Sequence, residues 1–161
     1  MVIFLFIQPS ISTSETEEMI IWICDHCCGL DHHYCYTVFV HNLPVPNTNI
    51  VGLNQIAIAQ SLLNATSNQV FVLRLRDNTS DPKQKGLLNI CVDSYSRLTD
   101  IFTEAFRLFN FRDYKKMASI EFDAAKQIDD CQTAFKSPTM TQRNWEMKEL
   151  SNMAVYAAKL L

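Results

Sequence analysis

The sequence predicts an all-α protein: an up-down-up-down four-helix bundle, preceded by a short N-terminal helical hairpin and braced by disulfides. Three observations support this fold class. Glycine occurs 3 times and proline 5 times in 161 residues, which is too few for the many turns of an all-β fold. Apolar residues recur at steps of three and four along most of the chain, the spacing of one face of a helix. The 6 cysteines are an even number, as in small disulfide-braced proteins.

The helical hairpin is predicted over residues 15–43. Its first helix ends near Cys28, where Gly29 suits a C-terminal cap. Asp31 stands where the N-cap of a second helix belongs, and this helix runs to about Asn42. Two prolines follow closely, and the second helix ends before them because proline lacks the backbone donor that a helix interior needs.

The bundle is predicted over residues 47–161, and its first helix spans about 49–76. One face of this helix is predicted to be apolar, because six of its residues recur at steps of three and four. These residues are Ile56, Ala59, Leu63, Thr66, Val70 and Leu73. A polar break follows at 78–80. Asp81 then supplies an N-cap carboxylate, and Pro82 is suited to the first position of the next helix.

The remaining three bundle helices each carry an apolar stripe of the kind that packs in a bundle. The second helix has Leu88, Cys91, Tyr95, Leu98, Phe102, Ala105 and Phe109, and its stripe loses phase at a turn over 110–112. The third helix has Tyr114, Met117, Ala124, Ile128, Cys131 and Phe135. After a break at Ser137-Pro138, the last helix has Met147, Leu150, Ala154, Ala157 and Leu161. The connections are short, so neighbouring helices are predicted to be antiparallel.

The cysteines fit this arrangement of antiparallel helices. Two residues face each other across a helical hairpin when the turn lies midway between them in the sequence. The midpoint of Cys91 and Cys131 is Phe111, inside a predicted turn, and the midpoint of Cys24 and Cys35 lies between the two N-terminal helices. Both pairs are therefore predicted to form disulfides. Two buried free thiols are the alternative for Cys91 and Cys131.

Cys27 and Cys28 have no assigned partner, and their pairing stays open. They belong to a cluster that offers a different hypothesis, a zinc-binding helical module. This cluster contains Cys24, Cys27, Cys28, His32, His33 and Cys35. A structural zinc site usually draws on two separated pairs of ligands, and no second pair follows at a usual spacing. We therefore predict no metal and no cofactor, and keep the zinc module as an alternative.

Charge and composition exclude several classes of function. The net charge is −3 and there is no basic stripe, so no nucleic-acid partner is predicted. The sequence contains no nucleophile elbow, P-loop, zinc-protease motif or dinucleotide fingerprint, so we predict that it is not an enzyme and has no catalytic residues. No run beyond the N-terminus approaches the ~18 apolar residues of a membrane span, so no membrane segment is predicted in the mature form.

The N-terminus predicts export. Residues 2–7 form a short apolar run, and small residues follow at a spacing that a signal peptidase reads. Residues 1–14 are therefore predicted to be a short, atypical signal peptide, and residues 15–161 to be a single domain. Two N-glycosylation sequons, at Asn64 and Asn78, are compatible with secretion.

Four short motifs, in this order along the chain, are similar to those of a known family. They are Cys24-Asp25-His26-Cys27 with Tyr34-Cys35, Cys91-Val92-Asp93-Ser94-Tyr95, Asn110-Phe111-Arg112-Asp113-Tyr114, and Phe135 with the segment 138–144. In combination they resemble the plant pectin methylesterase inhibitor and invertase inhibitor family over residues 15–161. The resemblance is closest to the invertase-inhibitor group.

The resemblance implies a secreted, non-enzymatic protein of the plant apoplast, or cell wall. Its partner would be a carbohydrate-active enzyme, either a pectin methylesterase or an acid invertase, whose active site it blocks. In the esterase inhibitors a face of the bundle lies across the substrate cleft of a parallel β-helix. In the invertase inhibitors a Pro-Lys-Phe motif at the end of the bundle enters the active site.

The residues of this chain that match the Pro-Lys-Phe region are Arg112, Asp113 and Tyr114, where an aromatic residue is kept and Pro-Lys is not. We therefore predict these three as the residues that contact the target. A diverged family member without inhibitory activity stays open as an alternative.

Overall fold

The computed structural model of the protein describes residues 14–27 and 31–161. The predicted signal peptide, apart from Ser14, lies outside the described residues, as do Cys28 and Gly29. The described parts of the chain form seven helices and no strand. Their bounds are α1 Glu15–Cys27, α2 His32–Asn42, α3 Ile50–Asp77, α4 Pro82–Asn110, α5 Tyr114–Glu121, α6 Ala124–Ala134 and α7 Pro138–Ala158.

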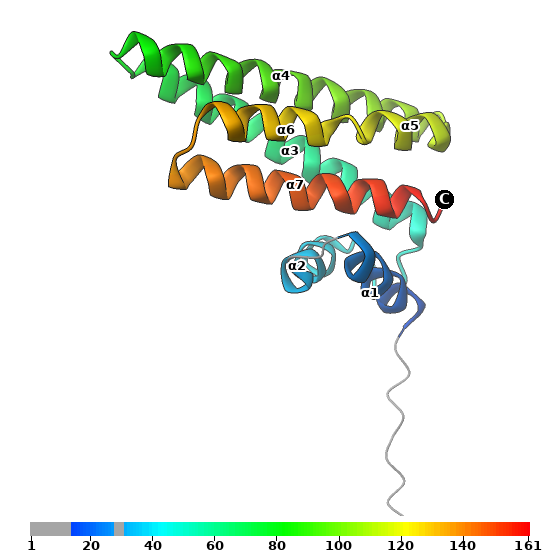
Figure 1. Ribbon diagram of the computed structural model, residues 1–161. Coiled ribbons are helices and arrows are strands. Elements are labelled where there is room, and N and C mark those ends of the chain that lie inside the picture. The colour runs from blue at the N-terminus through cyan, green and yellow to red at the C-terminus, as the bar shows by residue number, and fades with distance from the viewer. Residues whose placement is uncertain (1–13, 28–30) are drawn as a thin grey trace, which may run out of the picture.

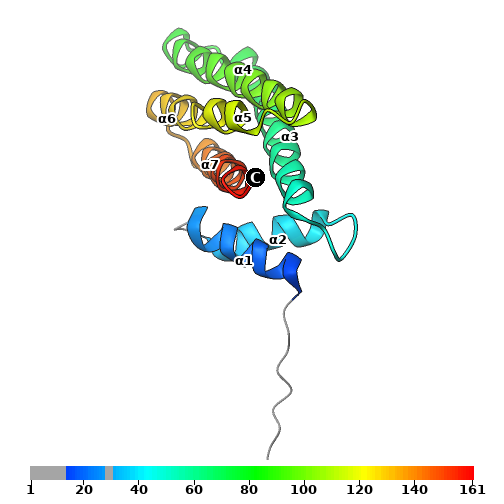
Figure 2. The same cartoon turned by 90° about the vertical axis from the view of Figure 1, so that its right-hand side faces the viewer.

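Helices α3 to α7 form an antiparallel four-helix bundle, in which α5 and α6 follow one another in line (Figure 1). The chain runs along the bundle in α3, back in α4, along again in α5 and α6, and back in α7. Helices α1 and α2 pack against each other and lie across one side of the bundle, against α7 and α3 (Figure 2). This is the predicted architecture of a helical hairpin followed by an up-down-up-down bundle.

Six helices begin at a capping side chain, and the caps are Ser14, Asp31, Asn49, Asp81, Asp113 and Ser137. Each cap accepts a hydrogen bond from a backbone N–H two or three residues later, over 2.9–3.2 Å. Such a cap satisfies one of the backbone donors that the first turn of a helix leaves without a partner. Proline occupies the start of the two helices α4 and α7. The helix breaks predicted at these positions are therefore confirmed.

The predicted third bundle helix is in fact two helices, because the hydrogen-bond ladder is interrupted at Phe122 and Asp123. Both residues keep right-handed backbone angles, so α6 continues in nearly the direction of α5 (Figure 1). Met117 and Ala124, on either side of the break, are seven residues apart, which is close to two helical turns. The apolar stripe keeps its phase across the break, and periodicity therefore gave no sign of it.

The apolar stripe predicted for α4 is confirmed, because all of its residues from Leu88 to Phe109 are buried. In α5 and α6 the stripe is buried from Met117 to Cys131, and its two end residues pack against the core from partly exposed positions. In α7 the predicted residues are buried except Leu161, which lies beyond the end of the helix and is exposed.

The apolar face predicted for α3 is wrong. Of its six residues only Ile56 is buried, while Leu63 is 62% and Val70 43% exposed. The buried face runs instead through Leu53, Ala57, Ser61, Ala65, Asn68 and Val72. Small and polar residues make up much of this face, so a pattern based on hydrophobicity points to the other side of the helix. Burial of Asn68 is tolerated because the fold supplies its hydrogen-bond partners.

A buried polar network around Asn68 joins four helices. Its Nδ2 donates to the hydroxyl of Tyr95 on α4 over 3.3 Å, and that hydroxyl donates to Oδ1 of Asn144 on α7 over 2.7 Å. Arg143 donates to Oδ1 of Asn68 over 2.5 Å. Asn144 in turn donates to Gln132 on α6 over 2.7 Å. Because a buried hydrogen bond needs both partners in place, this network fixes the relative positions of α3, α4, α6 and α7.

Replacing Tyr95 by phenylalanine is expected to lower the free energy of unfolding by about 1–3 kcal/mol, because buried partners of the hydroxyl lose a hydrogen bond. Urea unfolding followed by circular dichroism measures the change. The matched control is Tyr156→Phe on α7, where the ring is partly exposed and lies under the ammonium group of Lys159. The control is expected to change stability by less than about 0.5 kcal/mol. Equal effects of the two substitutions would contradict the role of the network.

One disulfide closes the α1–α2 hairpin, and another joins α4 to α6. Cys24 of α1 is bonded to Cys35 of α2, with Cα atoms 5.6 Å apart, and Cys91 of α4 is bonded to Cys131 of α6, with Cα atoms 4.4 Å apart. These are the two pairs that the hairpin geometry predicts, and the alternative of two buried free thiols at Cys91 and Cys131 is wrong. No cysteine in the described part of the chain is a free thiol.

Candidate functional site

The turn between α4 and α5 contains the residues predicted to contact a target. After the C-cap Phe111, Arg112 has a φ of 59°, in the left-handed region. The backbone N–H of Arg112 donates to the carbonyl of Phe109 and that of Asp113 to the carbonyl of Leu108, over 2.9 and 3.0 Å. These two bonds form a Schellman motif, in which glycine is the usual residue at the left-handed position. A side chain at this position costs roughly 1–2 kcal/mol.

The three predicted contact residues have different surroundings. Asp113 is exposed, but its carboxylate caps α5 by accepting a hydrogen bond from the backbone N–H of Lys116. Tyr114 is partly buried, and its ring packs against that of Phe109 with ring centroids 6.0 Å apart. Arg112 is exposed, and its side chain has no partner among the described residues. Of the three, Arg112 is therefore the most available to a partner.

Two exposed phenylalanines flank α5, and sequence reasoning did not identify them as contacts. Phe111 is 71% exposed and Phe122 is 73% exposed. The guanidinium group of Arg107 lies over the ring of Phe111, 5.4 Å from its centroid. Aromatic and arginine side chains are enriched at the energetic centres of protein interfaces. The sequence does contain a sign of their exposure: neither phenylalanine belongs to one of the predicted apolar stripes.

The same end of the bundle is locally basic. Residues 104–116 contain four basic and two acidic side chains, a net charge of +2 within a chain of net charge −3. Glu104 is paired with Arg107 over 2.6 Å, and the guanidinium lowers the pKa of the glutamate carboxyl. We call the exposed basic and aromatic residues of this end the tip surface: Arg107, Phe111, Arg112, Lys115 and Lys116. It suits a partner that presents carboxylates and aromatic rings.

An open groove lies between α4 and α6. It consists of two adjoining hollows of about 430 and 360 Å³, which share Arg97 and Gln127. Its charged lining residues are Asp93, Arg97, Asp100, Asp123, Lys126 and Asp130. No histidine or cysteine is among the residues that line it. The groove is thus lined by charges of both signs.

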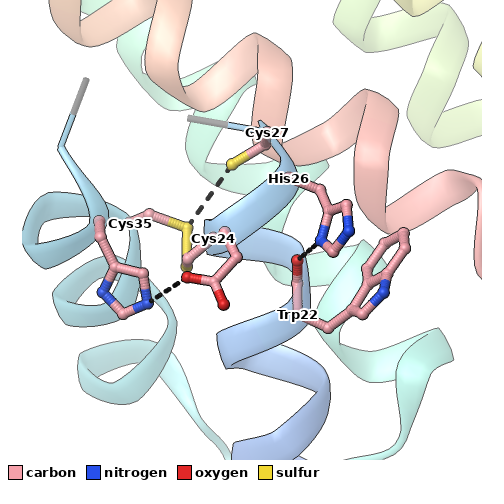
Figure 3. Close-up of polar contacts among 7 residues, drawn as sticks. Trp22, Cys24, His26, Cys27 and Cys35 are labelled. Atoms are coloured by element: carbon pink, nitrogen blue, oxygen red, sulfur yellow. Dashed lines mark hydrogen bonds and ion pairs between the residues drawn. A yellow bond between two sulfur atoms is a disulfide. The ribbon is translucent and has the colours of Figure 1, made fainter. Parts of the chain in front are cut away.

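The alternative zinc site falls on the α1–α2 hairpin, and Figure 3 shows Cys24, Cys27 and Cys35 of its set, while Cys28 lies outside the described residues. Cys24 and Cys35 are bonded to each other, and Cys27 Sγ lies 3.8 Å from Cys35 Sγ. Sulfurs in a disulfide are not thiolates and do not ligate zinc. His32 contacts the carboxylate of Asp25 over 3.2 Å. The described residues contain no group of three or more potential ligands that could hold a metal ion.

The family model described as "Plant invertase/pectin methylesterase inhibitor" matches residues 18–157, which is most of the chain. The chain belongs to this family. The resemblance seen in the four short motifs is therefore confirmed, and members of the family are inhibitors, not enzymes.

A pectinesterase inhibitor from Actinidia deliciosa is 24% identical to this member of the family over 121 residues. The alignment covers 70% of this chain and 64% of the relative, which is less than two thirds of the relative's length.

Two solved structures share the fold. A pectin methylesterase inhibitor from Arabidopsis thaliana superimposes with a TM-score of 0.67 at 20% identity, over 89% of this chain and 96% of the other. Mutant form A of a pectin methylesterase inhibitor from Arabidopsis superimposes with a TM-score of 0.79 at 21% identity, over 92% and 98% of the two chains. Among the described residues, no helix has both the length and the apolar character needed to span a bilayer.

Proposed function

We propose that this chain is a secreted inhibitor that binds across the active site of a plant pectin methylesterase. Membership of the family supports an inhibitor, and the relatives named above support the esterase as target. The absence of Pro-Lys before the aromatic of the α4–α5 turn weighs against invertase, which is the second candidate. The inhibitor domain comprises residues 15–161, with the hairpin over 15–43 and the bundle over 47–161.

The proposed mechanism is binding by a rigid surface. One disulfide joins α1 to α2, another joins α4 to α6, and a polar network joins four helices. A surface held in one conformation loses little entropy on binding, so more of the contact energy appears as affinity. The tip surface is the single observation that supports this function most, because it combines an exposed aromatic ring with four positive charges. We propose that it enters the substrate cleft and excludes the polymer.

The test is a paired inhibition titration with the oxidised protein at mildly acidic pH. One assay contains a plant pectin methylesterase and the other a plant acid invertase. Stoichiometric loss of esterase activity with unchanged invertase activity is the expected result. Loss of invertase activity alone would show that the target is an acid invertase and not a pectin methylesterase. If the folded, disulfide-bonded protein inhibits neither enzyme, the result would support the alternative that it is a diverged family member without inhibitory activity.

Phe111→Ala and Arg112→Gly, two substitutions in the tip surface, are each expected to raise the inhibition constant about tenfold. The reason is that an interface anchor contributes more than about 1 kcal/mol to binding. Arg112→Gly is informative because glycine adopts the left-handed conformation without strain, so stability is expected to stay constant or rise. The inhibition constant and the thermal midpoint are measured for each variant.

The matched control for the tip variants is Leu63→Ala, which removes an apolar side chain from α3 that is 62% exposed, against 71% for Phe111. Its inhibition constant is expected to be that of the parent protein. A loss of inhibition in Leu63→Ala, with the tip variants unaffected, would place the contact on α3 and contradict the proposed site.

We also propose that residues 1–14 direct the protein to the apoplast. The short apolar run at 2–7 and the disulfides support secretion, because disulfides persist in oxidising compartments. N-terminal sequencing of the protein recovered from apoplastic fluid tests this, with a start at Glu15 as the expected result.

A further inference from the structure

The two N-glycosylation sequons lie in very different surroundings. Asn78 is the C-cap of α3, in the short turn that leads to α4, and it is exposed. Its backbone N–H donates to the carbonyl of Arg74, while its side-chain amide has no partner among the described residues. Thr79 is the middle residue of this sequon and Ser80, which supplies the required hydroxyl, is exposed. The turn thus presents an unoccupied amide to solvent.

Asn64 lies instead in the middle of α3, in a half-buried position. Its Oδ1 accepts a hydrogen bond from Nδ2 of Asn68 over 2.8 Å, and Asn68 is 1% exposed at the centre of the polar network. Arg143, which donates to Asn68, also covers the ring of Phe71 at 4.0 Å from its centroid. A bulky sugar on Nδ2 of Asn64 would compete for space with these contacts between α3 and α7.

We propose that the folded, secreted protein carries one N-linked glycan, on Asn78, and none on Asn64. In this reaction Nδ2 of Asn78 loses a proton and bonds to C1 of an N-acetylglucosamine. The oligosaccharide comes from a lipid-diphosphate donor of the secretory pathway, and the lipid diphosphate leaves as the bond to C1 breaks. Both sites carry the same short motif, so the difference between them comes from their positions in the fold.

The position of the glycan has a consequence for target binding. Asn78 precedes the first turn of α4, and the tip surface begins at its last turn, at opposite ends of the bundle (Figure 1). With 29 residues, α4 is about 43 Å long. A glycan on Asn78 therefore covers the α3–α4 end of the bundle and leaves the tip surface free. The glycan site does not depend on the proposed inhibitory function.

The experiment uses the full chain placed behind a strong added signal peptide, so that secretion does not depend on residues 1–14. Protein secreted from plant cells is digested with a peptide N-glycosidase, and intact masses are compared before and after. The expected result is the loss of one glycan from the parent protein and from Asn64→Gln, and no mass change for Asn78→Gln. Ser80→Ala is expected to behave like Asn78→Gln, and the conservative Ser80→Thr like the parent protein.

Other outcomes overturn the proposal. A parent protein with no glycan, or with two glycans, contradicts it, as does a glycan that persists in Asn78→Gln and is lost in Asn64→Gln. The consequence for binding is tested separately by titrating the target enzyme with glycosylated and enzymatically deglycosylated protein. Equal inhibition constants are expected, and a stronger inhibition after deglycosylation would place the target contact near the α3–α4 turn.

Discussion

Joint replacement of Cys91 and Cys131 by alanine is expected to lower the free energy of unfolding by about 4 kcal/mol. The bond closes a loop with a sequence separation of 40 residues. Without it the unfolded chain gains the conformational freedom that this closure removes, and the folded state becomes less favoured. Both cysteines are fully buried, and alanine introduces no polar group into the core. Small domains are stable by only about 5–15 kcal/mol, so the loss is a large share of the total.

Denaturant unfolding without reductant measures this effect. The comparison variant is Cys24→Ala/Cys35→Ala, which opens a loop with a sequence separation of 11 and is expected to cost about 3 kcal/mol. Its effect is also expected to be local, because α1 and α2 lie outside the bundle (Figure 2). If the free energy of unfolding of the Cys91 and Cys131 variant fell by less than about 1 kcal/mol, the prediction would be contradicted. Opening a loop of this length is expected to stabilise the unfolded chain by more than that through its conformational entropy.

The stability of the protein is expected to fall as the pH rises through neutrality, because of Glu121. This side chain at the end of α5 is 1% exposed, and neither of its carboxylate oxygens has a hydrogen-bond partner in the described residues. Burial raises the pKa of Glu121 from 4.5 to about 8. Between these two values the folded state keeps a proton that the unfolded state has lost. The free energy of unfolding therefore decreases by up to about 1.4 kcal/mol per pH unit from this group.

Two substitutions separate the charge of Glu121 from its polarity. Glu121→Gln cannot ionise, so its stability is expected to lose this part of the pH dependence and to exceed that of the parent protein by a few kcal/mol at pH ~7.5. Glu121→Met also removes the buried polar atoms and is expected to stabilise the protein further, by about 1–3 kcal/mol. Urea unfolding at pH ~4.5 and ~7.5 measures both effects. A parent protein and a Glu121→Gln variant with parallel pH profiles would contradict the ionisation argument.

This pH dependence is compatible with the proposed location of the protein in the apoplast. At mildly acidic pH the Glu121 carboxyl is neutral in the folded protein, and the pH is still close to the ordinary pKa of 4.5, so little stability is lost to proton uptake on folding. A protein that works under such conditions tolerates a buried glutamate that would be costly at alkaline pH.

Only part of the candidate site could be predicted from the sequence. Arg112, Asp113 and Tyr114 were predicted as contacts from a motif, which falls on the turn between α4 and α5, and their contact with a target stays a prediction. The roles within the turn depend on backbone geometry: Asp113 caps α5, Tyr114 packs on Phe109, and the left-handed Arg112 is exposed. Exposure also distinguishes Phe111 from the phenylalanines of the core, because a side chain is buried only where another element covers it.

The sequence by itself determined most of the helix boundaries, the antiparallel order and the disulfide pairs. These properties follow from local signals: capping side chains, prolines, stripes of strongly apolar residues and the midpoints of cysteine pairs. Short connections then leave little choice in how consecutive helices pack.

The tertiary structure alone decided which face of α3 is buried, where the third bundle helix breaks, and which residues form the tip surface. In α3 the buried face contains Ser61 and Asn68, whereas Leu63 is exposed. A polar residue can be buried when partners from other helices satisfy its hydrogen bonds, and Tyr95 and Arg143 are such partners for Asn68. Those partners lie 27 and 75 residues away in the sequence, so no local pattern contains this information.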